Sequence, residues 1–273
     1  MTTSSYIFDG PDPDVILRAS LQPGSDEFKD FHVHKVILSI ASITFRDTFS
    51  IPQPPRHASE STTLDVVPLS ESADVLETFL RLIYPVDPPV IENLWLLDDL
   101  FRIADKYIAK GITAKLGKRL ISPSFLQHDP IGVFAIACRS NLDEEARLAV
   151  PHTFSIDVTN RIPEGRLQAM TAQTYHRLLT EHGLRRKQII DILDAARLSI
   201  DSHSQCQCLE RLKEETRSHI SGSPHLDRKT LQTSLSLVGS MGPSCRGMVW
   251  SNCITSAGFS KFVSDVMRRI QAL

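Results

Sequence analysis

The sequence lacks the features that mark several large functional classes. No segment approaches the ~20 consecutive apolar residues that a membrane-spanning helix requires. The first residues have neither the basic region nor the apolar core of a signal peptide. A glycine-rich phosphate loop, a nucleophile elbow and a His-Glu-x-x-His helix are also missing. These absences disfavour a membrane protein, a secreted protein and the enzyme classes that carry such motifs.

An excess of positive charge is missing too. The chain has 30 Lys and Arg residues against 32 Asp and Glu residues, which gives a formal net charge of −2. Nucleic-acid binding usually needs a broad basic surface, so this balance disfavours a nucleic acid as the partner. Cysteine is scarce and odd in number, with five residues, which favours reduced thiols over a disulfide framework. We therefore expect a soluble intracellular protein, of the nucleus or the cytoplasm, with no membrane partner.

The residues that are present are sufficient for a folded core. Apolar residues make up 41% of the 273 positions, which suits one large domain or two ordinary ones. Charged residues make up 23%, a share typical of folded rather than disordered chains.

The first 120 residues alternate between strand-like and helix-like patterns. Apolar and β-branched residues open two short segments that turn-forming residues separate, which predicts a hairpin. The apolar period then changes to that of a helix, and a third strand and further amphipathic helices follow. The predicted strands are residues 14–21, 28–33 and 64–69, and the predicted helices are residues 34–49, 70–84, 94–112 and 112–121.

The rest of the chain is helical in rhythm. Asp129 and Pro130 predict the start of a helix over 129–140, because Asp can cap a helix and Pro needs no N–H partner at its first position. Thr171 is predicted to cap a helix that Gly183 ends, and further helices are predicted over 185–200 and 256–271. The expected core residues of this part are Leu167, Tyr175, Leu178, Leu179, Ile189, Ile190 and Leu193.

The order of these elements, and the residues at their joints, resemble the BTB/POZ family. Asp14-Val15 matches the Asp-Val of its first strand, and residues 31–45 match its pattern Phe-x-x-His-Lys-x-x-Leu-x-x-x-Ser-x-x-Phe. The later strand and helices of the family are matched by VVPL (66–69), FLRLIY (79–84) and LFRIADKY (100–107), so that the resemblance covers roughly residues 12–120. The turn at Tyr84-Pro85 and the proline-rich loop after it look similar to fungal members.

The resemblance implies an α/β (α+β) domain, with a short sheet flanked by helices, followed by an all-helical C-terminal region. We expect a tail over 1–13, the BTB/POZ domain over 14–120, a helical (BACK-like) extension over 121–200, and a polar, cysteine-bearing segment with a terminal helix over 201–273. The implied function is that of a non-catalytic protein-interaction module without a cofactor. Its partners would be proteins, including a second copy of the chain in a homodimer.

Two residues are implied at a pocket near the family's dimer interface. Members often pair the Asp of the first strand with the basic residue that follows the His of the Phe-x-x-His-Lys pattern. In this sequence these two residues are Asp14 and Lys35. A solvated ion pair of little energetic value is the alternative for the same two side chains.

The resemblance also implies an alternative function, as a substrate adaptor for a cullin ubiquitin ligase. Members that bind cullins carry an apolar-x-Glu motif after a Phe-x-x-x-Phe helix, which here corresponds to Phe45 and Phe49. The loop that follows reads Ile51-Pro52-Gln53. Gln53 replaces the carboxylate and would remove a charge-assisted hydrogen bond, which weakens the cullin interpretation.

Metal binding is the remaining alternative. His32 and His34 point to the same side of an extended strand, but no further His or Cys lies close in sequence, whereas a structural zinc site needs four ligands. We instead predict that the His34 side chain hydrogen-bonds backbone groups at the helix start. The acidic pair Asp98-Asp99 is interpreted as part of a solvated helix face.

Four cysteines in the C-terminal segment could also bind zinc, namely Cys206, Cys208, Cys245 and Cys253. The Cys-x-Cys spacing is tighter than in most zinc sites and the gap to Cys245 is long, so reduced thiols are the alternative. A zinc-dependent regulatory or nucleic-acid-binding protein is therefore a second alternative function. Cys138 is predicted to be a core thiol.

Overall fold

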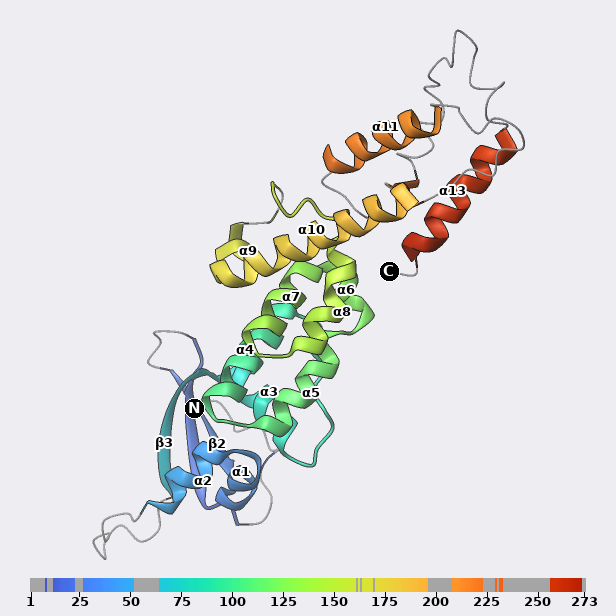
Figure 1. The fold of residues 1–273 in the computed structure, drawn as a ribbon. Helices are drawn as coiled ribbons and strands as arrows, with labels where there is room; N and C mark the ends of the chain where they lie inside the picture. Colours follow the sequence, from blue (N-terminus) through green and yellow to red (C-terminus); the bar gives the residue numbers. More distant parts are fainter. Residues whose placement is uncertain are drawn as a thin grey trace, which may run out of the picture. The chain divides into compact units, whose positions relative to one another are not determined.

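The computed structural model describes residues 8, 12–22, 27–51, 64–160, 162, 164–168, 170–195, 208–222, 229, 231–232 and 256–271. The chain divides into two compact units, Met1–Ala146 and Arg147–Leu273 (Figure 1). None of the described helices is both long and apolar enough to cross a membrane.

A three-stranded mixed sheet organises the first unit. It contains β1 (Val15–Ser20), β2 (Phe28–Val33) and β3 (Asp65–Ser72) in the order β2-β1-β3. The predicted hairpin is confirmed, since β1 and β2 are antiparallel with Val15 opposite Val33. β3 joins the other side of β1 in parallel, with Asp65 opposite Val15.

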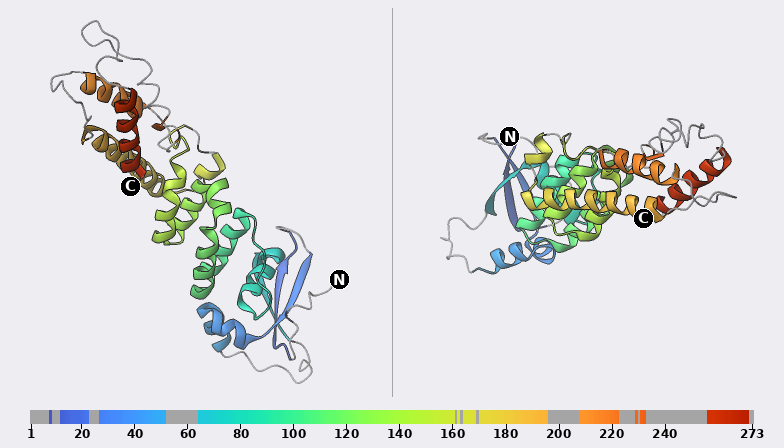
Figure 2. Two further views of the ribbon diagram at one scale, coloured as in Figure 1. Left: turned by 90° about the vertical axis from the view of Figure 1, so that its right-hand side faces the viewer. Right: turned by 45° about the horizontal axis from the view of Figure 1, so that its top comes forward.

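The sheet has one covered face and one open face. Figures 1 and 2 show the helices of this unit on the same side of the sheet. The covered face is formed by the alternate residues Val15, Leu17, Ala19, Phe31 and Val33, all of which are buried. On the open face Arg18 forms a two-pronged ion pair with Asp30, with both N–O distances at 2.7 Å.

Helices that precede β3 in the sequence and helices that follow it together build the core of this unit. They are α1 (Lys35–Ala41), α2 (Ile43–Ser50), α3 (Ala73–Ile83), α4 (Leu94–Lys106), α5 (Lys110–Leu120), α6 (Pro123–His128) and α7 (Pro130–Arg139), and α8 (Asp143–Thr153) crosses the boundary between the units. The start of α7 is confirmed, because the Asp129 side chain accepts a hydrogen bond from the Gly132 N–H at 2.8 Å.

The prediction of one helix over 34–49 is wrong. The chain is extended at Ser42, with φ of −138° and ψ of 127°, and this residue separates α1 from α2. The Ser42 hydroxyl accepts a hydrogen bond from the Phe45 N–H and donates one to the Tyr107 carbonyl. A serine that caps the next helix and also bonds a distant carbonyl cannot keep helical dihedrals, so the helix breaks there.

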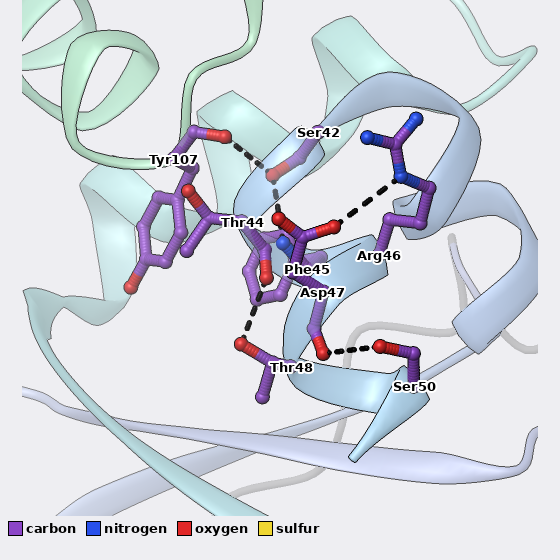
Figure 3. Close-up of polar contacts among 8 residues, drawn as sticks. All are labelled: Ser42, Thr44, Phe45, Arg46, Asp47, Thr48, Ser50 and Tyr107. Carbon is purple, nitrogen blue, oxygen red and sulfur yellow. Dashed lines mark hydrogen bonds and ion pairs between the residues drawn. The ribbon is translucent and has the colours of Figure 1, made fainter.

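The prediction of one helix over 94–112 is also wrong. α4 ends at Lys106, and Ile108, which lies inside the predicted helix range, has a φ of 49° and an exposed side chain. The Tyr107 carbonyl accepts hydrogen bonds from the Thr44 N–H of α2 and from the hydroxyl of its N-cap Ser42, and Figure 3 shows the contact with Ser42. This contact comes from a residue 65 positions away and fixes the turn between α4 and α5.

The second unit is helical in its described parts. It contains α9 (Glu164–Gln168), α10 (Ala172–Ala195), α11 (Cys208–Gly222) and α13 (Ser256–Gln271). The predicted cap is confirmed, since Thr171 Oγ1 accepts a hydrogen bond from the Thr174 N–H at 3.1 Å. The predicted helix over 256–271 is confirmed as α13, whereas residues 196–200 of the other predicted helix lie outside the described part.

The prediction that Gly183 ends a helix is wrong, because α10 runs through it. Buried residues lie on one face of α10 before and after the glycine, at Leu178, His182, Ile189 and Leu193. Packing along this face outweighs the cost of about 1 kcal/mol that a glycine brings to a helix interior. Of the other residues expected in the core, Leu179, Ile190 and Tyr175 are half-buried, and Leu167 is exposed.

Candidate functional site

An apolar patch lies on α1, on the side away from the core. Val36 is 64% exposed and Ile40 is 84% exposed, and Ile43 at the start of α2 is also exposed. Val36 and Ile40 are four residues apart and therefore lie on one face of the helix, whereas Leu38 is buried on another. We call Val36, Ile40 and Ile43 the α1 patch.

Lys35 fixes the start of α1 to the beginnings of the central strand β1 and the outer strand β3. Its backbone N–H donates to Asp14 Oδ1 at 2.7 Å, and its Nζ lies 3.1 Å from Asp65 Oδ2. Asp14 and Lys35 are thus brought together as the sequence suggested, but through the backbone N–H, while the ammonium group pairs with Asp65. The Asp14 carboxylate satisfies one of the N–H groups that have no partner within the helix.

His34 contacts a tyrosine instead of capping α1. Its backbone N–H donates a hydrogen bond to the Tyr84 hydroxyl at 2.8 Å, and its ring Nδ1 lies 3.2 Å from the same oxygen. The prediction that the His34 side chain hydrogen-bonds backbone groups at the helix start is wrong, since it makes no cap hydrogen bond. Its ring is turned towards Tyr84 instead. Burial raises the pKa of Tyr84 to about 12, so the hydroxyl stays protonated and links the end of α3 to the start of α1.

The two phenylalanines of α2 face inward. Phe45 is buried and stacks on Tyr107 with 4.5 Å between ring centroids, and Phe49 stacks on Phe45 at 5.8 Å. Phe45 therefore supports α2 from the core, whereas Phe49 is half-buried. The first residue after α2, Ile51, is 61% exposed. Gln53 lies outside the described residues.

The cysteines give no described metal site. Cys206, Cys245 and Cys253 lie outside the described residues, and Cys208 begins α11 with a side chain that is not described. Cys138 is half-buried on α7. Within the described ranges, no group of three His, Cys, Asp or Glu side chains could hold a metal ion.

The interpretation of Asp98 and Asp99 as a solvated helix face is wrong for Asp98 and holds for Asp99. Asp98 is buried and lies 3.4 Å from Arg102 of its own helix, and it also pairs with Arg139 of α7. Asp99 is more exposed, and its pKa is raised by partial burial and by the neighbouring charge of Asp98. Asp98 therefore has a structural role, joining α4 to α7.

The sequence reasoning missed the outer side of α1. Ile40 falls inside the helix predicted over 34–49, and it is the most exposed of the large apolar side chains that the structure describes. Apolar residues occur around the whole of α1, so periodicity alone does not indicate which of them the rest of the domain covers.

One comparison with known proteins identifies the first unit. No curated protein matches the sequence. The family model described as the BTB/POZ domain matches residues 14–124, which contain the sheet and α1 to α5. The predicted fold class is therefore confirmed: residues 14–124 form a BTB/POZ domain, a small mixed sheet flanked by helices, and a helical C-terminal region follows it.

Proposed function

We propose that this protein is an interaction module that self-associates through the α1 patch. A BTB/POZ domain indicates protein-protein interaction as its general role. The observation that supports self-association is the exposure of Val36 and Ile40 on a helix whose opposite side is part of the core. Isolated exposed apolar residues are common, but adjacent ones on a fixed helix are typical of interaction surfaces.

A two-fold dimer is the simplest way to cover this patch. In such a dimer the same surface of each copy contacts its counterpart, so Val36 and Ile40 would be buried in both copies. Burying each aliphatic side chain contributes about 1.5–3 kcal/mol, against an association cost of about 4–15 kcal/mol. The patch alone would thus give a weak dimer. The contacts of Lys35 with Asp14 and Asp65 already order the start of α1, which lowers the entropy cost of association.

Co-purification of two differently tagged full-length copies tests the proposal. Wild-type copies should purify together, and Ile40→Asp in both copies should abolish this, because it places two carboxylates in an apolar contact. Ile51→Asp is the matched control, since Ile51 is a similarly exposed isoleucine outside the patch. Equal co-purification of wild type and Ile40→Asp, with circular dichroism showing both folded, would contradict the proposal.

A cullin adaptor remains the second candidate function. The exposed Ile51 at the end of α2 supports it, because it occupies the apolar position of the implied cullin motif. The helices after the domain, over residues 121–200, would then present the substrate. Binding to a cullin N-terminal region should be lost in Ile51→Asp and kept in Ile40→Asp, and an absence of binding by the wild type would rule the adaptor out.

A further inference from the structure

A groove of about 410 Å³ lies along α3, outside the α1 patch. One wall is the exposed side of α3, with Asp74, Glu77 and Arg81. The other wall is the proline-rich loop that follows this helix, with Pro88, Pro89 and Val90. The loop is held near α3 by a long hydrogen bond of 3.4 Å from Arg81 to the Asp87 carbonyl.

The two ends of the groove carry opposite charges. Asp74 lies in the first turn of α3 and Arg81 in the last turn. Glu77, between them, is neutralised by Lys29 at 2.6 Å. Within the described residues neither Asp74 nor Arg81 has an ion pair, and the Arg81 guanidinium makes only the long hydrogen bond to the Asp87 carbonyl. The groove therefore offers one acidic group and one basic group that a ligand could satisfy.

The loop wall of the groove is apolar, and its two prolines restrict its backbone. Val90 is 80% exposed, and Pro88 and Pro89 have fixed backbone φ angles and no N–H groups. This wall can contact an apolar side chain without first becoming ordered. A compact small molecule would be enclosed on too few sides, since ligand pockets usually surround most of their ligand.

We propose that this groove binds an extended peptide of a partner protein that carries a basic and an acidic residue three positions apart. Asp74 and Arg81 are seven residues apart on a helix, which is about 10 Å along its axis. In a polyproline II peptide, residues three apart lie on one side of the chain and are separated by about 9 Å. An apolar residue between the two charges would cover Val90. The groove lies outside the α1 patch, so the proposal does not depend on self-association.

Selection from a random peptide library on the full-length chain tests this inference. The Ile40→Asp background should be used, so that self-association cannot affect the outcome. Selected peptides should be enriched in one basic and one acidic residue three positions apart. Arg81→Glu should shift the selection to two basic residues, and Asp74→Lys should shift it to two acidic residues.

Direct titration of one selected peptide gives the quantitative check. Its affinity should fall at least tenfold in Arg81→Glu and in Val90→Asp. It should be unchanged in Arg46→Glu, an exposed arginine on α2. Peptides without the charge pair, or equal affinity for wild type and for a folded Arg81→Glu, would overturn the proposal. Circular dichroism establishes that each variant is folded.

Discussion

At the scale of single residues, His182 is a neutral histidine inside the second unit. It is only 3% exposed, and its Nε2 lies 2.9 Å from Thr153 Oγ1, which also donates to the Val150 carbonyl. The Phe154 ring packs edge-on against it at 5.1 Å between centroids. Burial, and secondly the charge of Arg186, lower the pKa of His182 to about 4.

This histidine predicts acid sensitivity. A pKa below the ordinary 6.5 means that His182 binds a proton more tightly in the unfolded chain than in the folded one. The contribution of neutral His182 to the free energy of unfolding is therefore fully present above about pH 6.5 and is lost as the pH falls towards 4. Between pH 7 and pH 5 the free energy of unfolding should fall by about 2 kcal/mol through this group. Chemical denaturation of wild type and His182→Gln measures it. The variant should be less stable at pH 7 but should lose less between the two pH values, and parallel losses would contradict this assignment.

Two glycines in helices should respond to alanine in opposite ways. A Cβ at Gly132 would lie 2.8 Å from a methyl of Leu94, whereas a Cβ at Gly183 would have no atom within 4 Å. Gly132→Ala should therefore lower the free energy of unfolding by about 1–3 kcal/mol through overpacking. Gly183→Ala should raise it by up to about 1 kcal/mol, because alanine favours a helix. Thermal denaturation of both variants checks the pair, and the same sign for both would contradict a tight contact between position 132 and Leu94.

At the scale of elements, the turn between α4 and α5 holds a strained residue. Ile108 is a β-branched residue with a left-handed φ of 49°, a conformation that costs about 1–2 kcal/mol outside glycine. Its side chain is exposed, so little packing opposes a change. Ile108→Gly should raise the free energy of unfolding by up to about 1 kcal/mol, after allowing for the greater freedom of glycine in the unfolded chain. Ile108→Ala is the control and should show no gain, because alanine keeps the strain, and an equal gain in both would refute it.

Most elements of the fold could be predicted from local patterns, but two of their ends could not. The hairpin, α7 and α13 follow from alternation, capping residues and helical periodicity. The breaks at Ser42 and Tyr107 depend on a hydrogen bond between residues 65 positions apart, which no local pattern contains. Gly183 shows the reverse case, since a local stop signal was overridden by packing along α10.

At the scale of the whole molecule, the candidate site could be predicted only in part. Asp14 and Lys35 were located by the family resemblance, and they do meet, although through a backbone N–H. The exposure of Ile40 could not be predicted, because it depends on which side of α1 the other helices cover. The groove along α3 likewise needs the loop after Tyr84 to be placed beside the helix, which depends on tertiary contacts.

The mass of the full-length protein in solution tests the central claim most directly. Sedimentation equilibrium should be measured over a concentration series up to the high micromolar range, for wild type and for Ile40→Asp. We predict that the wild type approaches twice its chain mass of 30.5 kDa as the concentration rises, and that Ile40→Asp stays at the mass of one chain. A wild type that remains a single chain throughout, or a folded Ile40→Asp that associates equally well, would contradict self-association through the α1 patch.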